Sequence, residues 1–164
     1  MNFQDRRLFN ELKYFKKNYN DINFNIKNEV IEFVVQNPKE KGYPKVKFVM
    51  IGFYPFNQPI VYVFINGEET KYLKILPYHS YPRIIKCIEN LKKIRAISIN
   101  GHCLCCNNIL CDGWSPACDL EKIVEEIKQV NYIKQQVKKL ITVNNLGKKY
   151  GLSDDIELYI YKFL

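Results

Sequence analysis

The chain of 164 residues lacks several features that would place it in a familiar class. It contains no uninterrupted apolar run of about 18 residues, the minimum for a membrane-spanning helix. Its opening, MNFQDRRLFNELK, lacks the apolar segment of a signal peptide. We therefore expect no membrane association and a reducing compartment, cytoplasmic or nuclear. In such a compartment clustered cysteines are more often metal ligands or catalytic thiols than disulfides.

The sequence also lacks the footprint of a nucleic-acid-binding protein. The formal net charge is +8, but Lys and Arg are spread along the whole length in short pairs such as Arg6-Arg7. There is no basic tail and no interleaved aromatic motif of the RNA-recognition type. We therefore do not expect a nucleic acid partner. The excess positive charge also suits an acidic protein surface, because it raises the rate of association with any polyanion.

Periodicity predicts one α+β domain over residues 1–164. An apolar share of 47% is enough for a core, and no repeat or low-complexity segment divides the chain. Leu8, Leu12 and Phe15 lie at helical spacing and predict an N-terminal helix over about 3–17. An antiparallel meander of about four strands should follow. Its predicted segments are 30–36, 45–53, 60–65 and a returning strand up to Leu76, with a tight turn at Asn66-Gly67.

The second half of the chain is predicted to be helical. Apolar residues at helical spacing begin after Pro82, where a first helical turn tolerates proline. A longer helix should start at Asp119 as its N-cap and run, bent or broken, to about residue 140. Residues 144–151 read as a loop, and the tail 152–164 as a C-terminal helix capped by Ser153. The apolar stripe of that last helix is Ile156, Ile160 and Phe163.

Five of the six cysteines fall between residues 103 and 118, in CLCCNNILCDGWSPAC, around the single tryptophan. Such a cluster could hold zinc, which takes four thiolate or imidazole ligands in a tetrahedron. The candidate ligands for that alternative are Cys103, Cys105, Cys106 and Cys111. Structural zinc sites usually pair ligands as C-x₂₋₄-C, whereas C-x-C-C directs adjacent side chains apart. The alternative to zinc is one reactive thiol among bystanders.

Two stretches carry a resemblance to a known family. YPFNQP at 54–59 resembles the Tyr-Pro-Phe-x-Pro-Pro loop of the ubiquitin-conjugating enzymes, and CNNILCDGWSPACDL at 106–120 resembles the segment around their active cysteine. The opening DRRLFNEL resembles their first helix. The order is also the family's: helix, strands, loop, cysteine segment, Trp-Ser-Pro-Ala, helix. The resemblance implies a ubiquitin-conjugating-enzyme-like fold, with an insertion at about 68–97 that includes the helix after Pro82 and with a tail at 152–164.

The resemblance also implies an activity and its residues. Without a gap, Cys106 falls on the family's active cysteine, while the family's Cys-Leu dipeptide occurs as Cys103-Leu104, so Cys103 is the alternative acceptor. The family's His-Pro-Asn motif is not present; Asn100 precedes the cluster and is the expected donor to the oxyanion. The carrier would accept ubiquitin or a ubiquitin-like protein as a thioester from an activating enzyme and pass it to lysine with a ligase. It needs no cofactor.

Partner surfaces follow from the same resemblance. Arg6, Arg7 and Lys13 on the first helix are expected to contact the activating enzyme. Phe56 on one loop, and Ser115, Pro116 and Ala117 on another, are expected to contact the ligase as a small exposed patch. Two alternatives remain open at this point. One is a catalytically inactive ubiquitin-binding variant of the same fold, and the other is a small zinc-binding interaction module.

Overall fold

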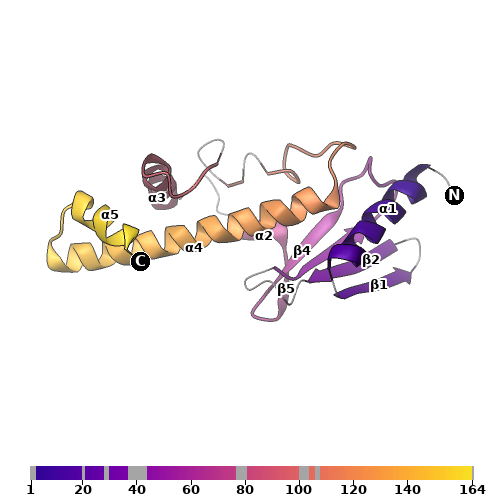
Figure 1. Cartoon of the computed structure of the whole chain (residues 1–164), viewed down its shortest axis with the longest axis horizontal. Coiled ribbons are helices and arrows are strands. Elements are labelled where there is room, and N and C mark those ends of the chain that lie inside the picture. Colours follow the sequence, from indigo (N-terminus) through magenta and orange to yellow (C-terminus); the bar gives the residue numbers. More distant parts are fainter. Residues whose placement is uncertain are drawn as a thin grey trace. The chain divides into compact units, whose positions relative to one another are not determined.

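The structure is a computed structural model (Figure 1). It describes residues 3–19, 21–27, 30–36, 44–76, 81–99, 104–105 and 108–163. The chain divides into two compact units: residues 1–76 with 106–128 form unit 1, and residues 77–105 with 129–164 form unit 2. The predicted insertion at about 68–97 therefore spans the boundary between the units. The single domain over 1–164 stays a prediction.

Unit 1 is a helix on an antiparallel sheet, which confirms the predicted α+β class. The N-terminal helix α1 (Phe3–Asn18) is followed by strands that pair strictly in chain order, β1-β2-β3-β4-β5. These strands are β1 (Asp21–Lys27), β2 (Val30–Gln36), β3 (Val46–Met50), β4 (Ile60–Ile65) and β5 (Glu68–Lys71). The sheet thus has five strands where about four were predicted.

The additional strand is β1, which lies in a stretch that the sequence analysis left without structure. It pairs with β2 along its whole length, from Asp21 opposite Gln36 to Lys27 opposite Val30. Its sequence DINFNIK alternates apolar and polar residues, which is the period of a strand. Asparagine is depleted in strands, and the Asn-rich composition masked that alternation.

Turn residues set where the later strands end. The predicted tight turn is confirmed: Asn66 and Gly67 both have positive φ, 53° and 88°, as a two-residue type I′ hairpin requires. β3 ends at Met50, before the predicted Phe53, because Gly52 turns the chain with φ 75°. The returning strand was predicted up to Leu76, but β5 ends at Lys71 and the short helix α2 (Tyr72–Ile75) follows.

The core of unit 1 forms between α1 and the sheet. Phe33 on β2 lies opposite Phe48 on β3, and their rings stack with centroids 5.1 Å apart. Phe15 of α1 packs on both rings at 6.3 Å, and all three side chains are buried. Each such aromatic side chain contributes about 1.5–3 kcal/mol by leaving water. The predicted apolar face of α1 is therefore the face that holds the helix on the sheet.

Unit 2 is helical. It contains α3 (Pro82–Lys93), as predicted, the part of α4 (Leu120–Tyr150) after Lys128, and α5 (Asp154–Lys162). The predicted cap of α4 is confirmed, because the Lys122 N–H donates to Asp119 Oδ1 at 2.8 Å. Although α4 has 31 residues, neither it nor any other helix in the described part of the chain is apolar enough to cross a membrane.

The predicted loop at 144–151 is wrong, because α4 continues unbroken to Tyr150. Asn144 and Gly147 suggested a loop, but both face Glu157 of α5 instead. A Cβ atom at position 147 would overlap the Glu157 carboxylate, and the Asn144 amide, with its NH₂ toward α5, donates to Glu157 Oε2 at 2.9 Å. The helix ends at Tyr150, and the next residue, Gly151, has a φ of 67° and closes a Schellman turn in which the Leu152 N–H donates to Gly147 O.

Arg95→Gly is expected to stabilise the protein by about 0.5–1 kcal/mol. Arg95 closes the same kind of turn after α3, in which the Ala96 N–H donates to Leu91 O. Unlike Gly151, Arg95 has a side chain, and its φ is 57°. That conformation costs a non-glycine residue about 1–2 kcal/mol, part of which the extra backbone entropy of unfolded glycine offsets. The midpoint of urea unfolding measures the change. Gly151→Ala is the reverse control and should destabilise; an unchanged midpoint for Arg95→Gly would contradict the argument.

Candidate functional site

Glu11 connects three segments of unit 1 that are far apart in the sequence. Its carboxylate accepts hydrogen bonds from Arg7 Nε on the same helix at 2.7 Å and from the Tyr54 hydroxyl at 2.7 Å. It also accepts the backbone N–H of Leu120, the first residue of α4, at 3.0 Å. One half-buried carboxylate thus joins α1, the 54–59 loop and the start of α4. We call this arrangement the Glu11 junction.

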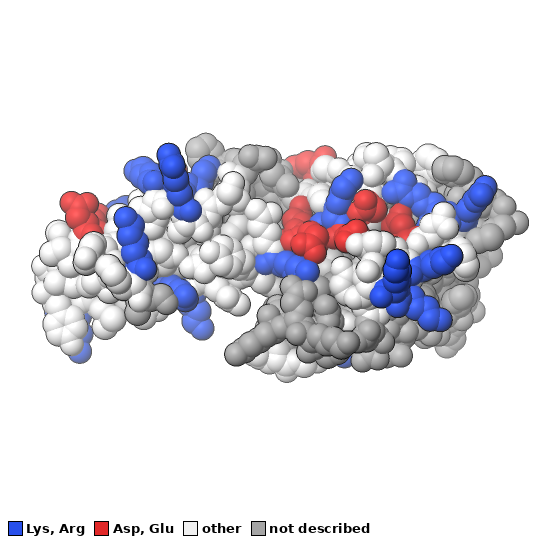
Figure 2. Space-filling view, viewed as in Figure 1, with Lys and Arg blue, Asp and Glu red and all other residues white. Residues whose placement is uncertain are grey.

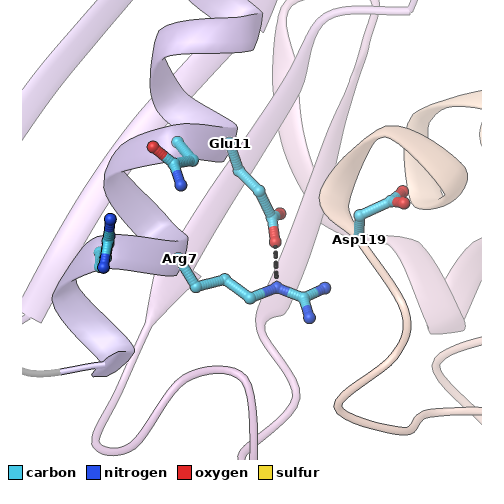
Figure 3. A pocket seen from close by; sticks show the side chains of 5 residues that line it. Arg7, Glu11 and Asp119 are labelled. Atoms are coloured by element: carbon cyan, nitrogen blue, oxygen red, sulfur yellow. Dashed lines mark hydrogen bonds and ion pairs between the residues drawn. The ribbon is translucent and has the colours of Figure 1, made fainter.

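Arg7 completes the Glu11 junction. Its guanidinium donates to the carbonyl oxygens of Pro116 at 2.6 Å and Cys118 at 2.9 Å while it pairs with Glu11. Figure 3 shows Arg7 reaching from α1 toward the segment that leads into Asp119. The hydrogen bond with Glu11 raises the pKa of Arg7. Of the three residues expected to contact an activating enzyme, Arg6 and Lys13 are exposed. Arg7 is half-buried, and its guanidinium binds groups of this chain.

A pocket of about 580 Å³ lies at the same place. It is lined by Arg6, Arg7, Asn10, Glu11 and Asp119 (Figure 3). Most of its charge is already paired, because Arg7 and Glu11 bind each other and Asp119 caps α4. The pocket is therefore better suited to a polar contact surface on α1 than to an enclosed reaction centre.

Trp114 brings the two predicted ligase-contact loops together. Its indole N–H donates to Pro55 O at 3.0 Å, and its ring lies 6.0 Å from the ring of Tyr54. Burial, with the hydrogen bond to Glu11, raises the pKa of the Tyr54 hydroxyl, so this phenol stays protonated as a donor. On these loops Phe56, Pro116 and Ala117 are exposed, while Ser115 is half-buried.

A second buried cluster holds the residues that follow Cys106. Glu126 of α4 accepts the Ile109 N–H at 2.8 Å, the Tyr72 hydroxyl at 3.3 Å and the Asn108 amide. The side-chain oxygen of Asn108 accepts a hydrogen bond from the Leu110 N–H at 2.9 Å. Burial raises the pKa of Glu126, against the opposing effect of its hydrogen-bond donors. This Glu126 cluster anchors residues 108–110 to α4.

The expected acceptor, Cys106, lies outside the described residues, and so do Cys103 and Asn100. Of the described cysteines, Cys111 is exposed, Cys105 is half-buried and Cys87 is buried, which raises the pKa of its thiol. Cys118 is half-buried, with its sulfur 3.6 Å from Ser115 Oγ. Within the part of the chain that the structure describes, no three His, Cys, Asp or Glu side chains could hold a metal. Two of the four candidate zinc ligands are not in that part.

Surface charge is mixed. In Figure 2, which shows one face of the molecule, Lys and Arg side chains stand in small separate groups with Asp and Glu among several of them. The excess of positive charge therefore does not make one basic tract on that face.

The two carboxylates that organise the site, Glu11 and Glu126, were not among the residues predicted from the sequence. Glu11 follows Leu8 by three residues and precedes Phe15 by four, so helical spacing places it beside the apolar face of α1, and this was the signal for a partly buried carboxylate. Glu126 precedes Ile127 on a helix rich in charge, and only its place next to the buried face hinted at burial.

Comparison of the chain with models of protein families, with curated proteins and with solved structures finds no match.

Proposed function

We propose that this chain is a divergent ubiquitin-conjugating enzyme that carries ubiquitin or a ubiquitin-like protein as a thioester on Cys106. The observation that carries the proposal is the Glu11 junction. It joins the three stretches that resemble the family, namely the first helix, the Tyr-Pro-Phe loop and the Trp-Ser-Pro-Ala segment, although they lie up to 111 positions apart in the sequence. A chance likeness of short motifs gives no reason for such an arrangement.

The order of elements supports the same reading. α1, an antiparallel meander with the 54–59 loop between β3 and β4, the Trp114 segment and then a helix capped by Asp119 follow the order that the resemblance implies. We propose on the same grounds a ubiquitin-conjugating-enzyme-like fold with an inserted helix and C-terminal helices.

The chemistry asks little of the protein. The Cys106 thiolate attacks the thioester carbonyl that the activating enzyme carries, and the activating enzyme's cysteine leaves as a thiolate. The exchange is close to isoenergetic, so the site needs an accessible thiol and a donor for the oxyanion more than a strong base. We assign the donor role to Asn100. A lysine amine of the substrate later attacks the same carbonyl, the Cys106 thiolate leaves, and a proton is lost from the amine.

The Glu126 cluster has a place in this scheme. It anchors the backbone just two residues after Cys106 through Asn108 and Ile109. A carrier thiol that two different enzymes must reach needs a fixed position more than an enclosed site. The cluster holds residues 108–110 on α4, and these are the described residues that follow Cys106 in the sequence.

One assay separates this proposal from the alternatives. The purified chain is incubated with ubiquitin or a ubiquitin-like protein, ATP and the cognate activating enzyme. We expect an adduct that appears on gels without reductant and disappears with excess thiol. Across a panel of modifiers, no adduct together with measurable ubiquitin binding would favour an inactive binder instead. Stoichiometric zinc in the purified protein, with no adduct, would favour the zinc-binding module.

Phe56→Ala is expected to leave thioester loading within about twofold of the original protein and to lower ligase-stimulated transfer at least about tenfold. Phe56 is an exposed apolar side chain beside the Trp114 segment, and such exposed aromatic residues are frequent binding hot spots. Single-turnover discharge of the loaded chain, with and without ligase, measures both steps. Phe53→Ala changes an equally exposed phenylalanine three residues earlier and serves as the matched control. A parallel fall in loading and transfer would mean that Phe56 packs the loop.

A further inference from the structure

The C-terminal helix α5 is amphipathic, but its polar face is buried and its apolar face is exposed. It turns polar side chains toward α4, against which it folds back in Figure 1. Glu157 and Tyr161, one turn apart, are both buried, and the Tyr161 hydroxyl donates to Gln136 Oε1 of α4 at 2.6 Å. Gly147 leaves the space that the Glu157 side chain occupies. Packing on α4 therefore uses the polar face of α5.

The apolar face of α5 points to solvent. The sequence predicted a stripe of Ile156, Ile160 and Phe163, and Tyr159 joins it at the spacing i, i+3, i+4, i+7. Their exposed fractions are 48%, 64%, 36% and 73% for Ile156, Tyr159, Ile160 and Phe163. The rings of Tyr159 and Phe163 lie 4.9 Å apart, so the outer part of the stripe is continuous. A contiguous exposed apolar stripe of this kind marks an interaction surface.

The charges at the two ends of α5 indicate what covers the stripe. Asp154 and Asp155 begin the helix and Lys162 ends it. If two copies of α5 lie antiparallel across a twofold axis, the acidic end of each lies next to Lys162 of the other. The two helix dipoles are then antiparallel and attract each other. A parallel pair would bring like charges together. The stripe is thus complementary to itself in one orientation.

We propose that α5 is a self-association surface and that its occupant is α5 of a second copy of this chain, antiparallel to the first. The interface is small, because a nine-residue helix supplies less than the roughly 800 Å² per partner of a standard interface. The dimer should therefore be reversible, with a dissociation constant in the range of about 1–100 μM. This proposal is independent of the proposed enzymatic activity.

The first test is sedimentation equilibrium of the full chain over a range of concentrations. We expect a monomer–dimer equilibrium, and Tyr159→Glu should raise the dissociation constant at least about tenfold, because it places a carboxylate in the centre of the apolar contact. Phe53→Glu is the matched control: its side chain is 67% exposed in unit 1, and the variant should dimerise like the original protein. A chain that stays monomeric at every concentration would overturn the proposal, as would equal weakening by both variants.

A charge exchange tests the antiparallel orientation. Asp155→Lys and Lys162→Asp should each weaken the dimer about tenfold, because each turns two symmetric attractions into repulsions. Mixing the two single variants should restore dimerisation, since each end of the mixed pair again meets the opposite charge. Failure of the mixture to associate would overturn the antiparallel pair.

Binding of monomers to neutral phospholipid vesicles, lost in Tyr159→Glu, would show that a membrane covers the stripe and would also overturn the proposal.

Discussion

Cys106→Ser is expected to convert the adduct with ubiquitin from one that excess thiol cleaves into one that withstands reduction. A thioester is cleaved by thiol–thioester exchange, whereas the oxygen ester formed by serine is a much poorer acceptor for a thiol. Loss of the labile adduct should be complete, because the variant has no thiol at position 106 to form a thioester. Nonreducing and reducing gels of the loaded protein measure the change.

The neighbouring cysteines provide matched controls for this prediction. Cys103→Ser, Cys105→Ser and Cys111→Ser should leave the labile adduct intact. If Cys103→Ser alone converts the adduct, the carrier chemistry holds but the acceptor is the cysteine of Cys103-Leu104. If two or more of these variants lower the bound zinc in step with folding, the cluster is a metal site. Each outcome therefore assigns the cluster to one chemistry.

Glu11→Ala is expected to lower the free energy of unfolding by about 3–5 kcal/mol. The carboxylate is largely buried and accepts three donors, and its removal leaves the Tyr54 hydroxyl and the Leu120 N–H without this partner. Each buried donor without an acceptor costs about 1–3 kcal/mol, and the Arg7 cation loses its counter-charge. Urea unfolding followed by circular dichroism measures the loss.

Two further variants test whether the Glu11 junction explains that loss. Glu11→Gln keeps one acceptor oxygen and should cost about half as much as Glu11→Ala. Lys13→Ala changes an exposed residue of the same helix and should alter stability by less than about 0.5 kcal/mol. Equal effects of Glu11→Ala and Lys13→Ala would mean that helix propensity, and not the junction, sets the change.

Local patterns predicted the elements whose signals lie within a few residues. The apolar face of α1, the Asn66-Gly67 turn, the start of α3 at Pro82 and the Asp119 cap all depend on side chains near one another in sequence. Such signals work because propensity, capping and turn chemistry act over one or two turns of chain. For that reason the α+β class and the meander could be predicted.

The rest depended on contacts between distant residues. Glu11 and Glu126 read as ordinary surface carboxylates, and only the folded chain brings their donors to them. Likewise Gly147 breaks a helical pattern in the sequence, but it lies within α4 because Glu157 of α5 fills the space beside it. Tertiary contacts override local propensity at such positions. The position of Cys106 and Asn100 stays a prediction from the resemblance.

The end of the sheet at β5 bears on how this chain behaves at high concentration. β5 has four residues, and its Glu68, Glu69 and Lys71 are exposed along the edge that would receive a further strand. Short, charged edge strands resist pairing with strands of other molecules, because an arriving backbone would have to bring its own side chains against these charges. Strand addition at β5 and its route to amyloid-like aggregates are thereby disfavoured. Aggregation of concentrated protein should accordingly not begin at the β5 edge.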